Sequence, residues 1–265
     1  MNTYMRVNHK LKPAIKFWWI FIGLLFTFIF STASATEKIT VVTEEYPPFN
    51  YTENGKLTGY SVTIAEELLK RATIEYKMDS YPWARAYKLA QNMPNVLIFT
   101  ITRTPERESQ FYWIGAVAQR KLFLYKLAAR TDIRVRQLED VKKYKIGVTR
   151  GDAIEDFFIK NGFESDNNLD LSPADTFNVQ KLLIGRIDFI ASTEFSIAYL
   201  SKLFGLGEHQ IERSLLIVDE GEYFFAMSKK TPIELVKKMQ LTFSEMEKDK
   251  VMVDIAKKYN VPKFK

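Results

Sequence analysis

The chain has 265 residues, a formal charge of +6 at pH 7 and no cysteine. The lack of cysteine excludes disulfides, thiol catalysis, thiolate metal sites and a lipid-modified N-terminal cysteine. Because its only histidines are His9 and His209, the sequence also argues against serine–histidine catalysis and multi-histidine metal centres. We therefore expect neither a metal nor a cofactor.

The first 35 residues predict a signal peptide. Residues 1–16 carry four basic and no acidic side chains, residues 17–30 are almost entirely apolar, and small residues follow at Ala33 and Ala35. The apolar run has 14 residues, fewer than the about 20 that span a membrane, so we expect cleavage after Ala35 and export to the periplasm. The mature chain would have 230 residues and a charge of +2, which argues against nucleic acid as a partner, and it would not be membrane-embedded.

From residue 39 onward, short apolar runs alternate with amphipathic patterns, which predicts an α/β fold. The predicted strands are residues 39–43, 96–99, 122–125, 145–148 and 189–191. The predicted helices are residues 61–71, 82–91, 174–185, about 196–203 and one that starts at Asp152. Asp152 and Thr231 are predicted N-caps, each followed three residues later by a glutamate. Pro232 would then open the last helical segment.

The segment Thr102–Arg107 directly follows a predicted strand and contains the most suggestive binding pattern. Thr104 could cap a turn that Pro105 begins, so that free backbone N–H groups and the Arg107 guanidinium converge on an anion. A guanidinium can hold a carboxylate with two parallel hydrogen bonds. The pattern fits equally well an ordinary capped turn in which Arg107 forms a surface ion pair.

Acidic and aromatic residues follow the first predicted strand. Ligands of open α/β sheets bind outside the carboxyl ends of strands, so Tyr46 could be a wall for the solute and Glu44 or Glu45 an acceptor for a cation. Trp83 and Arg85 could add a stacking surface and a donor. Alternatively, Tyr46 only seals the core.

The second half of the chain contains two further candidate binding segments, each at the carboxyl end of a predicted strand. One is the link from Arg150 to Ala153, where the Ala153 N–H group at a helix N-terminus could face an anion, although many such links look alike. The other is Thr193 with Glu194, which follow the strand at residues 189–191.

Several segments occur in a characteristic order: Val42-Thr43, Tyr46–Phe49, Gly59–Val62, Ile101–Arg107, Gly147–Asp152 and Gly185–Asp188. Together they resemble the family 3 extracellular solute-binding proteins, which are the amino-acid-type substrate-binding proteins of ABC importers. The resemblance covers residues 39 to about 259. Its most specific element is the Thr-Pro-Glu-Arg turn at residues 104–107.

The resemblance implies a two-lobed, type II periplasmic-binding-protein fold, with two crossover strands between the lobes and a ligand cleft. We expect residues 36–117 and 223–265 to form the first lobe and residues 118–222 the second. The resemblance further implies that Arg107 holds a ligand carboxylate. The expected ligand-binding residues are Glu44, Glu45, Tyr46, Trp83, Arg85, Thr102, Thr104, Arg107, Arg150, Ala153, Thr193 and Glu194. We expect a monomer without catalytic activity that delivers a small carboxylate-bearing solute, an amino acid or a related carboxylate, to an ABC permease.

The sequence departs from the family at two positions. Thr193 stands where amino-acid binders usually have an aspartate for the ligand ammonium, and Ser61 where they often have an aspartate. Recognition of a carboxylate is therefore better supported than recognition of an ammonium, and the solute could lack an α-amino group. Two alternatives stay open: a dehydratase-like enzyme with Glu44, Glu45 or Glu194 as general acid or base, and a ligand-sensing module for a membrane receptor.

Overall fold

The computed structural model describes Met1 and residues 38–165, 167–207 and 209–261. The predicted cleavage site and almost all of the predicted signal peptide lie outside these residues. The chain from Lys38 onward clusters into one unit. Among the described helices, none is long and apolar enough to cross a membrane.

The first of two five-stranded sheets has the strand order β4-β1-β5-β12-β6. Its strands are β1 (Lys38–Thr43), β4 (Glu75–Ser80), β5 (Val96–Thr102), β6 (Phe111–Gln119) and β12 (Glu222–Ser228). β1 pairs in parallel with β4 and β5, whereas β12 is antiparallel to both β5 and β6. A short hairpin, β2 (Tyr51–Glu53) with β3 (Lys56–Thr58), follows β1.

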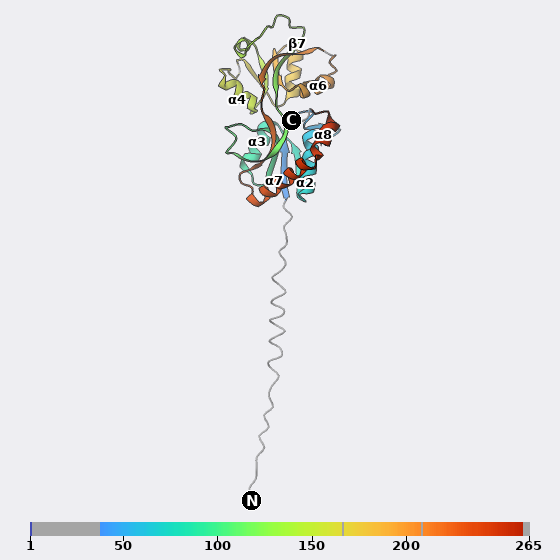
Figure 1. Ribbon diagram of the computed structural model, residues 1–265. Helices are drawn as coiled ribbons and strands as arrows, with labels where there is room; N and C mark the ends of the chain where they lie inside the picture. The colour runs from blue at the N-terminus through green and yellow to red at the C-terminus, as the bar shows by residue number, and fades with distance from the viewer. Residues whose placement is uncertain (2–37, 166, 208, 262–265) are drawn as a thin grey trace. The chain divides into compact units, whose positions relative to one another are not determined.

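Helices cover both faces of this sheet because successive strand residues point to opposite sides. Val41 packs with α2 (Tyr60–Arg71), α7 (Ile233–Lys248) and α8 (Val251–Tyr259) in one apolar cluster. Its neighbour Val42 packs on the other side with α3 (Trp83–Asn92). Figure 1 shows α3 on one side of the sheet and α2 with α8 on the other. Since both faces are buried, β5 is apolar almost throughout.

The second sheet has the strand order β11-β7-β10-β8-β9. Its strands are β7 (Leu122–Leu127), β8 (Ile146–Thr149), β9 (Leu169–Ser172), β10 (Phe189–Ser192) and β11 (Ile211–Val218). The accompanying helices are the 3-10 helix η1 (Leu138–Lys143), α4 (Ala153–Lys160), α5 (Asp175–Leu183) and α6 (Glu194–Leu203). η1 and α4 contribute to one apolar cluster, and α5 and α6 to the other.

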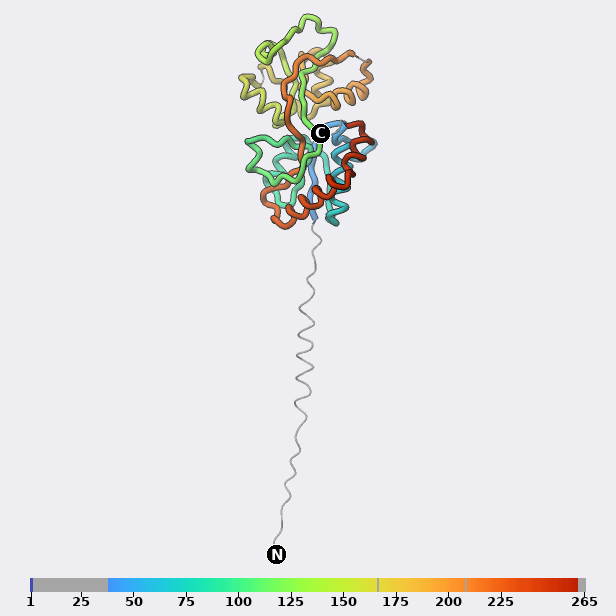
Figure 2. Tube along the Cα trace, in the orientation of Figure 1, coloured from blue at the N-terminus to red at the C-terminus, as the bar shows by residue number. Residues whose placement is uncertain are grey.

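The two sheets define two lobes, so the predicted two-lobed α/β fold is confirmed. We call the elements around the first sheet the first lobe and those around the second sheet the second lobe. The chain crosses from one sheet to the other between Gln119 and Leu122 and returns between Val218 and Glu222. The two connections run next to each other (Figure 2), and the Arg120 N–H group donates to the Gly221 carbonyl oxygen at 2.8 Å.

The predicted cap of the last helical segment is wrong. α7 begins at Ile233 rather than Pro232, and no side chain caps it. The Thr231 hydroxyl instead accepts a hydrogen bond from the Asn95 N–H group at 3.2 Å. This tertiary hydrogen bond replaces the predicted local cap. At the other predicted cap, the Asp152 carboxylate accepts from the Ile154 N–H group at 2.8 Å, as expected.

Candidate ligand-binding cleft

Side chains of both lobes and of one crossover enclose a small cavity at the carboxyl ends of the strands. Its walls are Glu44, Tyr46, Thr100 and Tyr223 of the first lobe, Arg120 of a crossover, and Leu122, Thr149, Asp152, Ile154, Asp175 and Ala191 of the second lobe. The cavity measures about 30 Å³, which is room for about one or two water molecules. This space is too small for an amino acid, so the lobes must separate to admit a solute of that size.

The Glu44 carboxyl group lies directly beyond the end of β1. The residue is 6% exposed, and no described residue forms a hydrogen bond or ion pair with its carboxyl group. Burial raises the pKa of Glu44 well above its ordinary value, the charges of Asp152 and Asp175 raise it further, and Arg107 opposes them. A buried carboxylate without a partner is costly, so a cation that entered the cavity would stabilise the ionised form of Glu44.

The second lobe brings two carboxyl groups to the same cavity. Asp175, the first residue of α5, accepts a hydrogen bond from the Thr149 hydroxyl at 2.8 Å. Burial raises the pKa of Asp175 from 3.8 to about 6. The Thr149 hydrogen bond opposes this rise, and the charge of Asp152 adds to it by a smaller amount. Asp152 lies 3.9 Å from the Arg120 guanidinium, which is too long for a hydrogen bond. The cavity wall therefore carries three acidic groups and one guanidinium.

A β-bulge explains how Thr100 reaches the cavity. Thr100 is the extra residue between two paired positions of the β5–β12 ladder, and its φ is 59°. This left-handed conformation is rare for a β-branched residue, and bulges next to functional sites often redirect a side chain. The Thr100 hydroxyl donates to the Asn50 side-chain oxygen at 2.6 Å, and the Asn50 amide donates to the Glu44 carbonyl oxygen at 2.7 Å. This chain of hydrogen bonds holds the backbone at Glu44 in place.

Tyr46 forms part of the cavity wall and also packs against the core. Its ring stacks on Phe49 at 5.3 Å between centroids, and its hydroxyl lies 2.9 Å from the Tyr223 hydroxyl. Burial raises the pKa of Tyr46 to about 12 and that of Tyr223 well above its ordinary value. Both phenols are therefore neutral donors at physiological pH.

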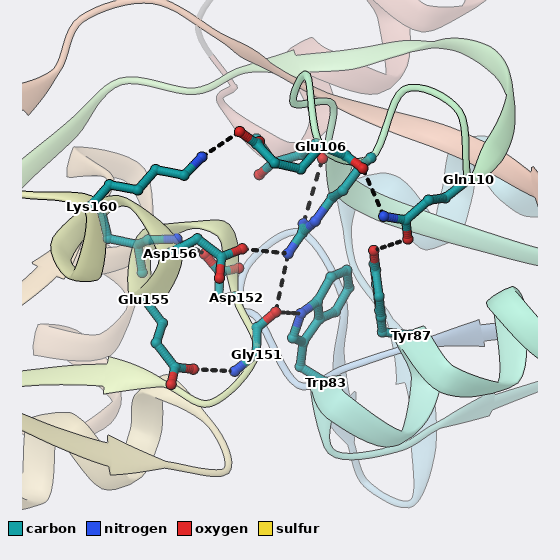
Figure 3. A network of polar contacts seen from close by, with 12 residues as sticks. Trp83, Tyr87, Glu106, Gln110, Gly151, Asp152, Glu155, Asp156 and Lys160 are labelled. Carbon is teal, nitrogen blue, oxygen red and sulfur yellow. Dashed lines mark hydrogen bonds and ion pairs between the residues drawn. The ribbon is translucent and has the colours of Figure 1, made fainter. Parts of the chain in front are cut away.

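Arg107 bridges the two lobes beside the cavity instead of lining it. Its Nη2 donates to the Gly151 carbonyl oxygen at 3.0 Å, and Trp83 Nε1 donates to the same oxygen at 2.8 Å (Figure 3). Arg107 is 3% exposed, and its guanidinium lies 4.9 Å from the centre of the Tyr87 ring and 4.0 Å from the Asp156 carboxylate. Arg107 is thus a buried residue rather than the surface ion pair that the sequence left open.

The geometry of Gly151 allows this bridge. Its φ of 75° lies in the left-handed region that favours glycine, and the turn aims its carbonyl group at the first lobe. An ion pair between Lys160 and Glu106 joins the lobes on the same side (Figure 3). The structure therefore represents the closed arrangement of the two lobes.

The other residues of the predicted turn surround Arg107. The Thr104 carbonyl oxygen accepts from the Arg107 N–H group at 3.0 Å, and residues 105–110 form turns rather than a helix. Thr102 is 5% exposed, and its hydroxyl oxygen has no hydrogen-bond partner among the described residues. Ala153, the first residue of α4, lies between two cavity residues, Asp152 and Ile154.

Five predicted site residues lie away from the cavity. Thr193 and Glu194 line a different groove of about 640 Å³, and the Thr193 hydroxyl caps α6 by accepting from the Ser196 N–H group at 3.0 Å. Glu45 accepts hydrogen bonds from Thr52. Arg85 and Arg150 are exposed, and Arg85 packs on the ring of Tyr81.

Six polar residues of the cavity wall were not predicted as site residues from the sequence: Thr100, Arg120, Thr149, Asp152, Asp175 and Tyr223. Thr149 ends β8 and Asp175 follows β9, so the rule that ligands bind at the carboxyl ends of strands could have found them. Arg120 lies in the first crossover and Tyr223 near the start of β12, directly after the second crossover. Thr100 carries no sequence signal, because its bulge depends on pairing with β12.

Comparison with known proteins identifies the family. Residues 39–262 match the bacterial extracellular solute-binding proteins, family 3. The chain belongs to this family. Its members are solute-binding proteins and not enzymes, so the dehydratase-like alternative is not supported.

Individual relatives agree with this assignment. The chain is 26% identical over 226 residues to the L-cystine-binding protein TcyJ of Escherichia coli (strain K12), covering 81% of this chain and 79% of that protein. An ancestral arginine-binding protein bound to arginine superposes with a TM-score of 0.74 at 22% identity, covering 84% of this chain and 97% of the other. A histidine kinase sensor domain similar to periplasmic binding proteins superposes with a TM-score of 0.76 at 16% identity, covering 84% and 95%. These two structures share the fold with this chain.

Proposed function

We propose that the protein captures an amino acid or a closely related carboxylate-bearing solute in the periplasm and delivers it to the permease of an ABC importer. The observation that carries this proposal is the cavity between the lobes, whose wall contains three carboxyl groups and one guanidinium. Such a set of charges is complementary to a zwitterion. The name of TcyJ and the arginine-bound neighbour point to the same class of solute.

The proposed binding mode uses the opening and closing of the lobes. In the open form, the Arg107 guanidinium would separate from the Gly151 carbonyl oxygen that it contacts at 3.0 Å. A solute carboxylate would then take this place on Arg107, with the Thr102 hydroxyl and the Ala153 N–H group as further donors. Tyr46 would form one wall of the enlarged cavity, and Trp83 would pack beside Arg107.

A thermal-shift screen tests this proposal. A ligand that binds only the native state raises its apparent stability by an amount set by the ratio of ligand concentration to Kd. We expect one or a few of the standard L-amino acids to raise the midpoint of the purified protein, and sugars such as glucose and ribose to leave it unchanged. A response to sugars alone would contradict the proposal.

Location and oligomeric state also belong to the proposal. We infer cleavage after Ala35 and a periplasmic mature chain, because the N-terminal segment has the charge and apolar pattern of a signal peptide. We further propose that the mature chain is a monomer. The intact mass of periplasmic protein should correspond to a chain that begins at Thr36. Recovery of the full-length chain from the membrane fraction would contradict this.

Sensing is the second candidate function, favoured by the likeness to a histidine kinase sensor domain. That likeness is one of fold, and the same fold can serve both purposes. Stimulation of the ATPase of a reconstituted permease by the solute-bound protein would support delivery. Solute-dependent binding to a receptor kinase, without such stimulation, would support sensing.

A further inference from the structure

The charges on the wall of the cleft cavity are not balanced. Glu44, Asp152 and Asp175 line it, against the single guanidinium of Arg120. Asp152 caps α4 and is the one of the three that has a cation near it, with Arg120 at 3.9 Å. Neither Glu44 nor Asp175 forms an ion pair with a described side chain, so these two carboxyl groups remain for a cationic group of the solute, and they come from different lobes.

Glu44 is the more informative of the two. It is 6% exposed and lines the cavity, yet no described residue donates a hydrogen bond to its carboxyl group. Asp175 is held toward the same cavity by the Thr149 hydroxyl at 2.8 Å. Burying a carboxylate without a partner is costly unless it is neutralised or paired. The arrangement thus gains stability when a positive group enters between the lobes.

We propose that the cleft requires a solute with a primary ammonium group, and that Glu44 and Asp175 accept its hydrogen bonds from opposite lobes. An ammonium group has three donors and no acceptor, which suits a site built from two carboxylates. Because one carboxylate belongs to each lobe, the cation gains both contacts only in the closed form and so favours closure. This inference rests on the proposed solute capture and adds that the amino group is required, although Thr193 occupies the position of the usual aspartate.

An organic cation fits this site better than a metal ion does. In residues 38–165, 167–207 and 209–261, no group of three or more histidine, cysteine or acidic side chains is placed to hold a metal. The hydroxyl groups of Tyr46 and Tyr223 stand on the same wall and remain neutral. The cavity therefore offers hydroxyl groups and separate carboxyl groups, as an amino acid needs.

Binding of the ammonium should release protons. Burial raises the pKa of both Glu44 and Asp175, whereas a cation favours the ionised carboxylates. The other charged or titratable groups that face these two are Glu45, Tyr46, Arg107, Arg120, Asp152 and Tyr223. Because several groups share the cleft, the release has to be assigned by substituting Glu44 and Asp175 individually.

The first test compares solutes with and without nitrogen. The standard L-amino acids are screened beside L-lactate, succinate and glutarate, which have carboxylates but no ammonium. We expect thermal shifts from amino acids only. A nitrogen-free acid that binds as tightly as the best amino acid would overturn the ammonium site and leave solute capture intact. A panel in which nothing binds would count against both.

The second test uses Glu44→Gln and Asp175→Asn, which remove charge at constant shape, with Glu53→Gln on the exposed end of β2 as the matched control. By calorimetric titration with the best amino acid, each cleft variant should lose at least about thirtyfold in affinity. The control should bind within about twofold of wild type. Titrations at pH 6 in buffers of different ionisation enthalpy should show proton release by wild type and less release by the cleft variants.

Folding has to be checked separately. Glu44→Gln should be at least as stable as wild type in urea unfolding without solute, because it removes a buried carboxyl group that has no partner. A stable Glu44→Gln protein with lost affinity supports the inference. If folded Glu44→Gln and Asp175→Asn both bind within about threefold of wild type, the inference is wrong.

Discussion

Replacing Arg107 by lysine shows whether the guanidinium holds a solute carboxylate or only the second lobe. In the closed structure Arg107 Nη2 donates to the Gly151 carbonyl oxygen at 3.0 Å, and the residue is 3% exposed. Lysine keeps the charge but loses the planar pair of donors. Loss of a buried, hydrogen-bonded charge pair with a solute costs about 2–5 kcal/mol, or roughly thirtyfold and more in affinity. We expect a loss in this range for Arg107→Lys.

Trp83→Phe is the matched control, because Trp83 Nε1 donates to the same Gly151 oxygen at 2.8 Å. Phenylalanine removes this neutral donor and leaves the Arg107 charge in place. A neutral hydrogen bond contributes about 0.5–1.5 kcal/mol, so Trp83→Phe should weaken solute binding by at most about tenfold. It thereby measures how much the lobe-to-lobe bridge contributes by itself.

The assay is calorimetric titration of wild type and both variants with the best amino acid and with its carboxamide. For the amino acid, Arg107→Lys should cost clearly more than Trp83→Phe. For the carboxamide, which lacks the carboxylate, the two variants should differ little. Two results would refute the role of Arg107 as carboxylate anchor. One is an equal loss of affinity in both variants; the other is the same loss by Arg107→Lys for the amino acid and for its carboxamide. In that case Arg120, which already lines the cavity, becomes the candidate.

Two further predictions concern stability. Gly115→Ala should lower the free energy of unfolding by about 1–3 kcal/mol, because the new methyl carbon would lie 2.0 Å from the buried Phe243 ring. Urea unfolding measures this against Gly207→Ala, whose added carbon meets nothing closer than 3.9 Å; equal effects would contradict the packing argument. Asp175 should destabilise the solute-free protein as pH rises from about 4 to about 6, because its pKa is raised from 3.8 to about 6 in the folded state. Asp175→Asn should therefore show a shallower decline over this range, and parallel curves would argue against the raised pKa.

Much of the fold could be predicted from the sequence because its local patterns agree with the tertiary structure. The apolar run at residues 96–99 forms the first part of β5, and the pattern at residues 61–71 forms most of α2. The resemblance to a known family supplied the two lobes, which local patterns do not encode. At Thr231 the predicted helix cap was wrong, because its hydroxyl accepts a hydrogen bond from the Asn95 N–H group, which is distant in sequence.

The site could be predicted only where a single segment contains the information. Glu44 and Tyr46 follow directly on β1, so their place at a carboxyl end was readable from the sequence. Asp175 and Arg120 lie far apart in the chain, and only the folded structure shows that they line the same cavity. For Arg107, the sequence could not show that its donors would face the Gly151 carbonyl group.

Small-angle scattering with and without solute tests the central claim, which is capture of a solute between two closing lobes. The cavity of about 30 Å³ is too small for an amino acid, so the solute-bound form must hold the lobes further apart than they lie here. We expect the solute-free protein to open further still, because the crossovers allow the lobes to move as rigid bodies. With the amino acid that gives the largest thermal shift, we expect the radius of gyration to decrease at saturation. An unchanged radius of gyration at saturation would contradict the account.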